Sequence, residues 1–216
     1  MIDSQINLLV NQQNTYAFIV EDIEAAMANV DLKGSQAQRA SYGLQKTADA
    51  FMLGATTHTK AGNTVIDATC DSATILSVMS RTSTLLSEND VPDNGKYVVI
   101  APWVKEKLQL AGVKWGVNEG MDGSKGGVSF AKYLDLDVYV SNNVVQAAAS
   151  TGAATYCLAG SYRALGFAQG LLKSRAIESK DLFGYHMSGL MVYGKEVIFP
   201  KELVSMVLTY AAETAI

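Results

Sequence analysis

The chain has 216 residues, of which 49% are apolar and 18% are charged, and its net charge is −4. This length suffices for one large domain or two interleaved ones with an ample core. The Lys and Arg residues are scattered, which argues against the clustered positive charge of a dedicated nucleic-acid binder. The low share of charged residues favours a surface that is partly covered, most economically by other copies of the chain.

The first predicted elements are a β-hairpin and a short helical stretch. Apolar and polar residues alternate over residues 2–10, which predicts a strand with one buried face. The polar residues 11–14 predict a turn, and residues 15–20 predict the second strand of the hairpin. Acidic Glu21 and Asp22 then precede a helical stretch, because negative charge is favourable near a helix N-terminus.

A long helix is predicted over residues 35–53, because Ser35 is a good N-cap and Gly54 a good terminator. Gly43 interrupts this helix at a cost of about 1 kcal/mol relative to Ala. Its apolar stripe repeats at spacings of three and four: Ala37, Ala40, Leu44, Ala48 and Phe51. Five turns of helix are long enough to serve as the backbone of the molecule.

The middle of the chain is predicted to alternate between loops and regular elements. The polar residues 56–69 predict a loop, after which Asp71 or Ser72 caps a further helix. Residues 88–95 (ENDVPDNG) predict a turn and mark the clearest domain boundary. A buried strand is then expected at residues 97–101.

The second half of the chain mixes strands and helices without strict alternation. Pro102 suits the first position of a short helix that ends at Leu110, and the glycine-rich residues 111–127 predict a long loop. Strands are expected at residues 136–141, 155–158, 172–179, 185–193 and 196–199, and a helix at 161–170. This mixture predicts an α+β fold.

The sequence lacks the spacings that metal and redox sites require. His58 and His186 are far apart, and neither belongs to an HxxxH or HExxH pattern, so we expect one loop histidine and one strand histidine. Cys70 and Cys157 have no CxxC partner and are expected to be buried thiols.

Catalytic motifs are also lacking. The glycine-rich segment 116–127 places Lys125 after Ser124, in the reverse of the P-loop order, so we expect a surface loop. Asp135 and Asp137 are expected to alternate toward solvent beside a strand, and no GxSxG elbow is present. The sequence therefore predicts no catalytic, cofactor-binding or metal-binding residue and no cofactor.

The N-terminal residues lack the basic and apolar regions of a signal peptide, and no apolar run approaches the length that spans a bilayer. We therefore expect a chain that is made in a cytoplasm without a membrane partner.

Four segments together resemble the coat proteins of tailed bacteriophages with the Hong Kong 97 fold, and most closely a Gp5-type group found in prophages. They are YAFIVEDI at residues 16–23 with ANVD at 28–31, VVIAPW at 98–103, LDVYVSNN at 136–143, and CLAGS at 157–161 with GLMVYG at 189–194. The segments follow the family's order and spacing across nearly the whole chain.

The resemblance implies a P-domain with a long spine helix, over residues 1–94 and 175–196, and an A-domain with a central mixed sheet, over 95–174 and 197–216. It implies a major capsid protein without enzymatic activity, whose copies form pentamers and hexamers around double-stranded DNA without reading its sequence. Scaffolding and portal proteins are further implied partners. Assembly would take place in the bacterial cytoplasm and the product would be the virion capsid.

Family members carry an N-terminal arm and a long β-hairpin, the E-loop, before the segment that matches residues 6–20. Only about five residues precede that segment here, so the resemblance implies a shortened subunit. Two other functions stay open. An encapsulin-like compartment would have the same fold around a cargo enzyme. A small cytoplasmic enzyme would need a site without a recognisable motif.

Overall fold

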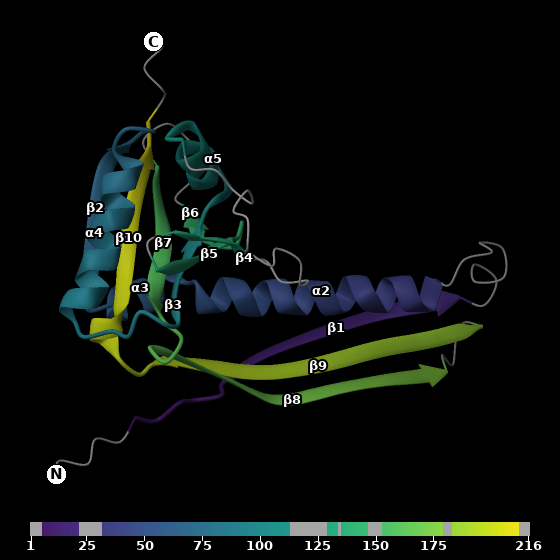
Figure 1. Ribbon diagram of the computed structural model, residues 1–216. Coiled ribbons are helices and arrows are strands. Elements are labelled where there is room, and N and C mark those ends of the chain that lie inside the picture. Colours follow the sequence, from purple (N-terminus) through teal and green to yellow (C-terminus); the bar gives the residue numbers. More distant parts are fainter. Residues whose placement is uncertain are drawn as a thin grey trace. The chain divides into compact units, whose positions relative to one another are not determined.

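The computed structural model describes residues 6–21, 32–112, 129–133, 135–146, 153–178 and 183–211 (Figure 1). The chain divides into two compact units. Unit 1 comprises residues 1–52 and 166–196, and unit 2 comprises residues 53–165 and 197–216. The chain therefore crosses between the units three times, after residues 52, 165 and 196.

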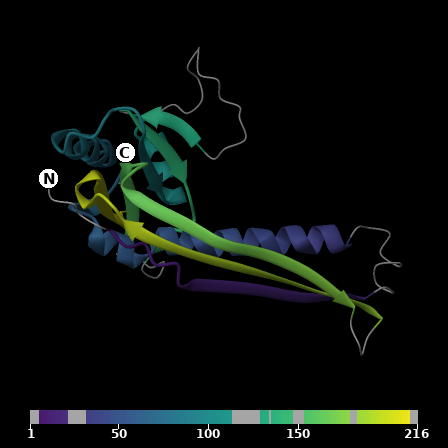
Figure 2. The same ribbon diagram turned by 90° about the horizontal axis from the view of Figure 1, so that it is seen from below.

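Unit 1 is a three-stranded sheet with one long helix. Its strands are β1 (Gln12–Glu21), β9 (Gly184–Val197) and β8 (Leu165–Glu178), in the order β1-β9-β8. Figure 2 shows the three strands side by side. Helix α2 (Leu32–Met52) packs along β1. The sheet therefore has one face toward a helix.

The expected N-terminal hairpin is wrong, because β1 pairs antiparallel with β9, from Gln12 opposite Tyr193 to Glu21 opposite Gly184. Residues 6–10 are not a strand, and the expected turn lies largely inside β1. Asparagine is common in turns, but Asn14 lies within β1, where its Nδ2 donates a hydrogen bond to the Tyr193 hydroxyl over 2.8 Å. A pairing partner so distant in sequence leaves no local signal. The stretch expected to be helical after Asp22 lies outside the described residues.

Helix α2 confirms the predicted long helix and its stripe. Leu44 and Ala48 are buried, and Ala37, Ala40 and Phe51 are half-buried. They face the sheet because residues three and four apart share one side of a helix. The cluster also includes two residues of β9 and one of β1: Met191, Tyr193 and Tyr16.

Replacing Gly43 by Ala is expected to stabilise the protein by about 0.5–1 kcal/mol. Gly43 lies within α2, and a Cβ there would meet no atom within 4 Å. Alanine loses less backbone entropy than glycine when a helix forms. Chemical denaturation of the two proteins measures the difference. A destabilised variant would show that the exposed side of α2 is packed against something in solution.

Unit 2 is built on a seven-stranded sheet in which β2, β10, β7, β3, β5 and β4 follow one another, and β6 pairs with β7. Its elements are α3 (Ala55–Lys60), β2 (Asn63–Cys70), α4 (Ile75–Glu88), β3 (Lys96–Ile100), α5 (Pro102–Leu110), β4 (Ser129–Tyr133), β5 (Leu136–Val140), β6 (Val145–Gln146), β7 (Ala154–Ser161), the 3-10 helix η1 (Pro200–Glu202) and β10 (Leu203–Tyr210). Strand β10 is parallel to β2 and antiparallel to β7.

Two sequence predictions in this part of the chain are wrong. Residues 56–69 are not a loop, because they form α3 and the parallel strand β2. Residues 161–170 are not a helix, because a turn at 162–164 leads directly into β8. The error at residues 56–69 has a non-local cause, because β2 becomes a strand through pairing with β10, which is distant in sequence. Strand β8 pairs with β9, the next strand of the chain.

The core of unit 2 lies between the sheet and the helices α4 and α5. Helix α4 contacts β2, β10 and α5. Along β3 and β5 the fully buried apolar residues alternate, as a strand with one helix-covered face requires: Val98 and Ile100 on β3, and Leu136 and Val138 on β5. On β10 the buried residues are consecutive from Leu203 to Met206, and Leu208 is also fully buried. The predicted buried strand before Pro102 and the helix that Pro102 begins are confirmed.

The division between the units differs from the expected one. The turn at residues 88–95 exists, with positive φ at Asp90 and Gly95. It joins α4 to β3 inside unit 2, however, and the chain already crosses after Met52. Residues 53–94 belong to unit 2 because α3, β2 and α4 pack on its sheet. A strong turn signal marks a reversal of the chain, whether or not a unit ends there.

Asp71 holds the turn that leads into α4, close to its predicted capping role. Its Oδ1 accepts hydrogen bonds from the backbone N–H groups of Thr74 and Ala73, over 2.8 and 3.0 Å. The Thr74 bond is the main cause that lowers the pKa of Asp71. The ionised carboxylate is therefore the form that stabilises this turn.

Replacing Asp71 by Ala is expected to lower the Tm at pH 7, because two N–H groups lose their acceptor. A lowered native pKa gives stability that is present above the unfolded pKa and is lost as the pH falls through the native one. The Tm difference between wild type and variant should therefore shrink in acid. A difference that is constant from pH 7 to pH 3 would contradict the role of the charge.

Candidate functional site

The two histidines have different surroundings and belong to different units. His58 lies on α3, not in the expected loop, and is buried. Its Nδ1 lies 2.9 Å from Ser205 Oγ, its Nε2 lies 3.2 Å from the Leu53 carbonyl oxygen, and its ring is near Tyr156. These contacts attach α3 to the sheet. His186 is a strand histidine, as predicted, on β9 opposite Ile19.

No metal centre is evident in the part of the chain that the structure describes. No three His, Cys, Asp or Glu side chains there gather closely enough to bind a metal ion. None of the described helices is both long and apolar enough to cross a membrane. The glycine-rich segment 116–127 with Lys125 lies outside the described residues.

The two carboxylates singled out from the sequence lie at the start of β5. Asp135 is exposed and has a φ of +65°, which a tight entry to the strand requires. Asp137 is half-buried on β5, opposite Tyr97 of β3. Neither is joined to a histidine or to the other carboxylate by a hydrogen bond among the described contacts. The structure brings together no acid and base pair here.

Cys70 and Cys157 are buried in unit 2, as predicted. Cys70 ends β2, and Cys157 lies in β7 opposite Met206 of β10. Burial raises the pKa of each thiol to about 12. Because the thiolate is the reactive form of cysteine, neither side chain has the character of a nucleophile.

In the native protein at pH 8, neither thiol is expected to react with a chromogenic disulfide reagent, whereas both should react after unfolding. The reason is the high pKa of the two buried groups. The absorbance of the released chromophore, measured with and without denaturant, gives the number of reactive thiols per chain. One equivalent released before unfolding would contradict the buried position of one of the cysteines.

Among the residues that the structure describes, two lysines are fully buried, which the sequence did not indicate. Lys96 Nζ donates to Asp93 Oδ1 over 2.7 Å and to Ser87 Oγ over 3.0 Å, and so joins the start of β3 to the end of α4. Lys107 Nζ donates to the Ala211 carbonyl oxygen and lies 4.6 Å from the centre of the Tyr210 ring. Each charge is satisfied locally, as buried charges must be.

An aromatic cluster lies on the sheet of unit 2. Tyr97 of β3 stacks on Tyr162 with ring centres 5.2 Å apart, and the hydroxyls of Tyr162 and Tyr139 are 2.6 Å apart. Burial raises the pKa of Tyr97 to about 12, and burial together with the Tyr139 hydrogen bond raises the pKa of Tyr162. Both phenols therefore stay neutral at ordinary pH.

Beside this cluster, Arg163 and Glu202 form a two-pronged ion pair. Arg163 Nε donates to Glu202 Oε2 over 2.9 Å, and its Nη2 lies 2.8 Å from Glu202 Oε1. The hydrogen bond to Glu202 raises the pKa of Arg163. The two residues are 39 positions apart and carry no motif, so no sequence signal could have found the pair.

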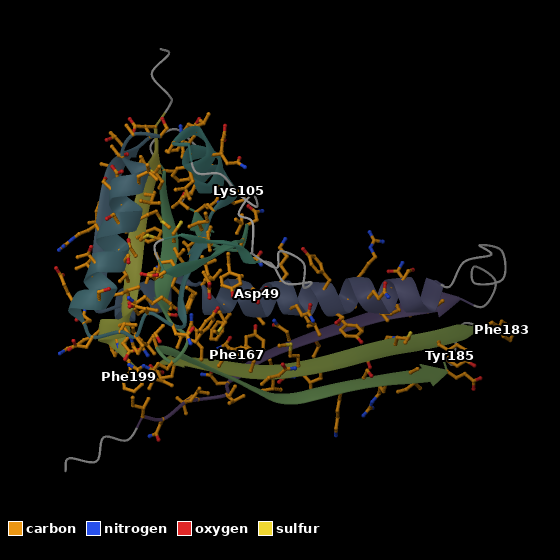
Figure 3. All side chains as sticks on the ribbon, in the orientation of Figure 1. Asp49, Lys105, Phe167, Phe183, Tyr185 and Phe199 are labelled. Atoms are coloured by element: carbon orange, nitrogen blue, oxygen red, sulfur yellow. The ribbon has the colours of Figure 1, made fainter. Side chains whose placement is uncertain are left out.

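The described surface is rich in large apolar side chains, mainly on unit 1. Figure 3 shows Phe183 projecting at the beginning of β9, and 88% of this residue is exposed. The others on unit 1 are Ile6, Leu9, Val10, Ile19, Tyr42, Phe167 and Ile177, and those on unit 2 are Ile66, Leu110, Tyr162, Phe199 and Tyr210. Surfaces that bind other proteins carry apolar side chains of this kind in contiguous patches.

Comparison with solved structures identifies the fold. The chain is similar to a structure from Mycobacterium phage Che8, with a TM-score of 0.73 and 20% identity, over 93% of this chain and 72% of that one. It is similar to the capsid structure of the cyanophage P-SCSP1u, with a TM-score of 0.72 and 16% identity, over 94% and 74%.

A third similar structure is the holo-SrpI encapsulin complex from Synechococcus elongatus, with a TM-score of 0.63 and 11% identity, over 94% of this chain and 77% of that one. No protein-family model and no curated protein matches the chain. The chain thus has the predicted Hong Kong 97-like capsid fold, with a long helix and a mixed sheet.

Proposed function

We propose that this chain is the major capsid subunit of a tailed bacteriophage, a structural protein whose copies assemble into the icosahedral shell around double-stranded DNA. The observation that carries the proposal is the similarity in fold to the P-SCSP1u capsid over 94% of the chain. The exposed apolar side chains of unit 1 support it, since a shell subunit binds its own copies through such surfaces.

We further propose that unit 1 is the P-domain, with α2 as its spine helix, and that unit 2 is the A-domain. This changes the expected boundaries to residues 52, 165 and 196. The assignment to the Gp5-type prophage group and the description as a shortened subunit rest on the sequence resemblance and stay predictions.

The proposal implies no enzymatic activity and no catalytic residue. Its partners are other copies of the chain, in pentamers and hexamers, with scaffolding and portal proteins as further partners. The net charge of −4 suits the inner surface of a shell that does not bind the packaged DNA duplex tightly, because negative charge weakly repels the phosphates. The expected location is the virion, after assembly in the bacterial cytoplasm.

An encapsulin-like compartment is the second candidate, because the SrpI encapsulin complex has the same fold with a TM-score of 0.63. Its TM-score is lower than those of the Che8 and P-SCSP1u structures, at 0.73 and 0.72. The two functions differ in the contents of the particle, since a capsid holds nuclease-resistant DNA and a compartment holds a protein cargo.

Immunoelectron microscopy on lysates of the producing cells tests the proposal. We expect antibodies against the chain to label particles that carry tails and contain nuclease-resistant DNA. Labelled particles without tails, filled with a second protein, would support the compartment. Antigen found only in a soluble low-mass fraction would contradict both functions.

A further inference from the structure

Asn94 and Gly95 form the only Asn-Gly pair in the sequence, and they lie in the turn between α4 and β3. An asparagine side-chain amide can be attacked by the backbone nitrogen of the residue that follows it. Glycine is the residue that hinders this attack least, because it has no β-carbon beside its nitrogen. The pair is therefore a candidate for spontaneous ring closure.

The structure leaves both reacting groups open. Asn94 is exposed and Gly95 is half-buried, with a φ of +95° that residues with a side chain rarely adopt. Among the residues that the structure describes, neither the Asn94 side chain nor the Gly95 N–H has a hydrogen-bond partner. Ring closure at this position consequently breaks no hydrogen bond of either reacting group.

Asn89, at the start of the same turn, provides an internal comparison. Its Nδ2 donates a hydrogen bond to the Leu85 carbonyl oxygen over 2.8 Å, and its N–H donates to the carbonyl oxygens of Leu85 and Leu86. The residue that follows it is Asp90, which has a side chain beside the nitrogen. The Asn89 amide is therefore held at the end of α4, whereas the Asn94 amide is not.

We propose that Asn94 is a site of spontaneous deamidation, which adds one negative charge to a chain whose net charge is −4. The Gly95 nitrogen gives up its proton and forms a bond to Asn94 Cγ. The Cγ–Nδ2 bond breaks, and the side-chain nitrogen leaves as ammonia with that proton. Water then opens the resulting cyclic imide at one of its two carbonyl carbons. One opening gives aspartate, and the other gives isoaspartate, in which the backbone runs through the side-chain carbon.

The two products have different consequences for the start of β3. The Gly95 carbonyl oxygen accepts a hydrogen bond from the Tyr162 N–H over 3.1 Å, and the buried Lys96 donates to Asp93 over 2.7 Å. Aspartate leaves the backbone unchanged. Isoaspartate inserts an additional carbon into the backbone directly before Gly95, so the turn must shift against both contacts. Only the isoaspartate product therefore destabilises unit 2.

Incubation of the purified protein at alkaline pH, followed by trypsin digestion and mass spectrometry, tests the site. Trypsin releases residues 82–96 as one peptide that contains both Asn89 and Asn94. In the folded protein Asn94 should gain the mass increase of deamidation. Asn89 should react at least about fivefold more slowly, because its hydrogen bond to Leu85 must break first. An unchanged Asn94 in folded protein, under conditions in which the denatured chain reacts, would overturn the inference.

The pH dependence tests the chemical step. The attacking nitrogen must be deprotonated, so the rate at Asn94 should rise about tenfold for each unit of pH. A rate that does not change with pH would contradict the proposed attack by Gly95.

Asn94→Gln is the matched control. Glutamine keeps the amide but places its carbonyl carbon one bond further along the side chain, so the closure that Asn94 undergoes is lost. The peptide of residues 82–96 should then stay unmodified, and the Tm of the fresh variant should equal that of wild type. Deamidation that persists at the wild-type rate in this peptide would place the reaction at another residue and overturn the assignment.

The consequence for the fold is measured by comparing the Tm of fresh protein, aged protein and Asn94→Asp. Asn94→Asp should unfold with fresh wild type. Protein enriched in isoaspartate should unfold about 2–4 °C lower, which corresponds to the loss of one hydrogen bond in a chain of this size. Equal Tm values for aged and fresh protein would overturn the expected effect on β3. The reaction requires no assembly, so its outcome is independent of the proposed function.

Discussion

Replacing Leu208 by Ala should lower the free energy of unfolding by about 3 kcal/mol. Leu208 is fully buried on β10, where it pairs with Asp67 of β2 on one side and Thr155 of β7 on the other. The substitution removes three buried carbon atoms and leaves a cavity that three packed strands cannot fill, and such changes cost about 2–5 kcal/mol. Denaturant titration followed by tryptophan fluorescence measures the effect.

The control for this variant is Ile66→Ala on the neighbouring strand β2. Ile66 is 72% exposed, so its truncation should change the unfolding free energy by less than about 0.5 kcal/mol. A loss below 1 kcal/mol for Leu208→Ala would place β10 outside the core. A large loss for Ile66→Ala would show that β2 is covered in solution by another copy.

Replacing Gly62 by Ala should destabilise the protein by about 1–3 kcal/mol. A Cβ at this position would lie 2.6 Å from the Pro200 oxygen, 2.8 Å from the Pro200 carbonyl carbon and 3.0 Å from the Lys201 nitrogen. All three are backbone atoms, which cannot rotate away as a side chain does, so η1 must shift. Forced displacement of a packed segment has a cost of this size.

Gly43→Ala is the natural comparison, since the same substitution in open space on α2 should have the opposite sign. The paired measurement therefore separates the effect of close packing from the general effect of replacing glycine. Equal and small changes at both positions would contradict the close approach of η1 to the segment before β2.

The sequence predicts those elements of this fold whose signal is local. The stripe of α2 and the Pro102 start of α5 depend on residues within a few positions of each other, and both are confirmed. The partners of β1 and β2 are distant in sequence, and there the predicted hairpin and loop were wrong. The helix predicted at residues 161–170 was also wrong, although β8 pairs with β9, the next strand of the chain. The register between strands that are distant in sequence is decided by the packing of their side chains, and a short stretch of sequence does not contain both partners.

The charged contacts of unit 2 were harder to predict. Arg163 and Glu202 are ordinary charged residues in the sequence, and only the return of β9 beside the β7–β8 turn brings them to 2.8 Å. The buried Lys96 likewise reads as a surface residue at the start of a strand. The fold was predicted from the resemblance of four segments to tailed-bacteriophage coat proteins. That resemblance depends on the order and spacing of the segments along nearly the whole chain, and not on any one short stretch.

The most direct test of the central claim is mass photometry of the purified chain over a series of concentrations, with electron microscopy of the heaviest fractions. The proposed function predicts masses that rise with concentration through five- and six-copy rings to closed shells of one class. A single species at 23.1 kDa at every concentration, pH and salt condition would contradict the claim that this chain builds a shell.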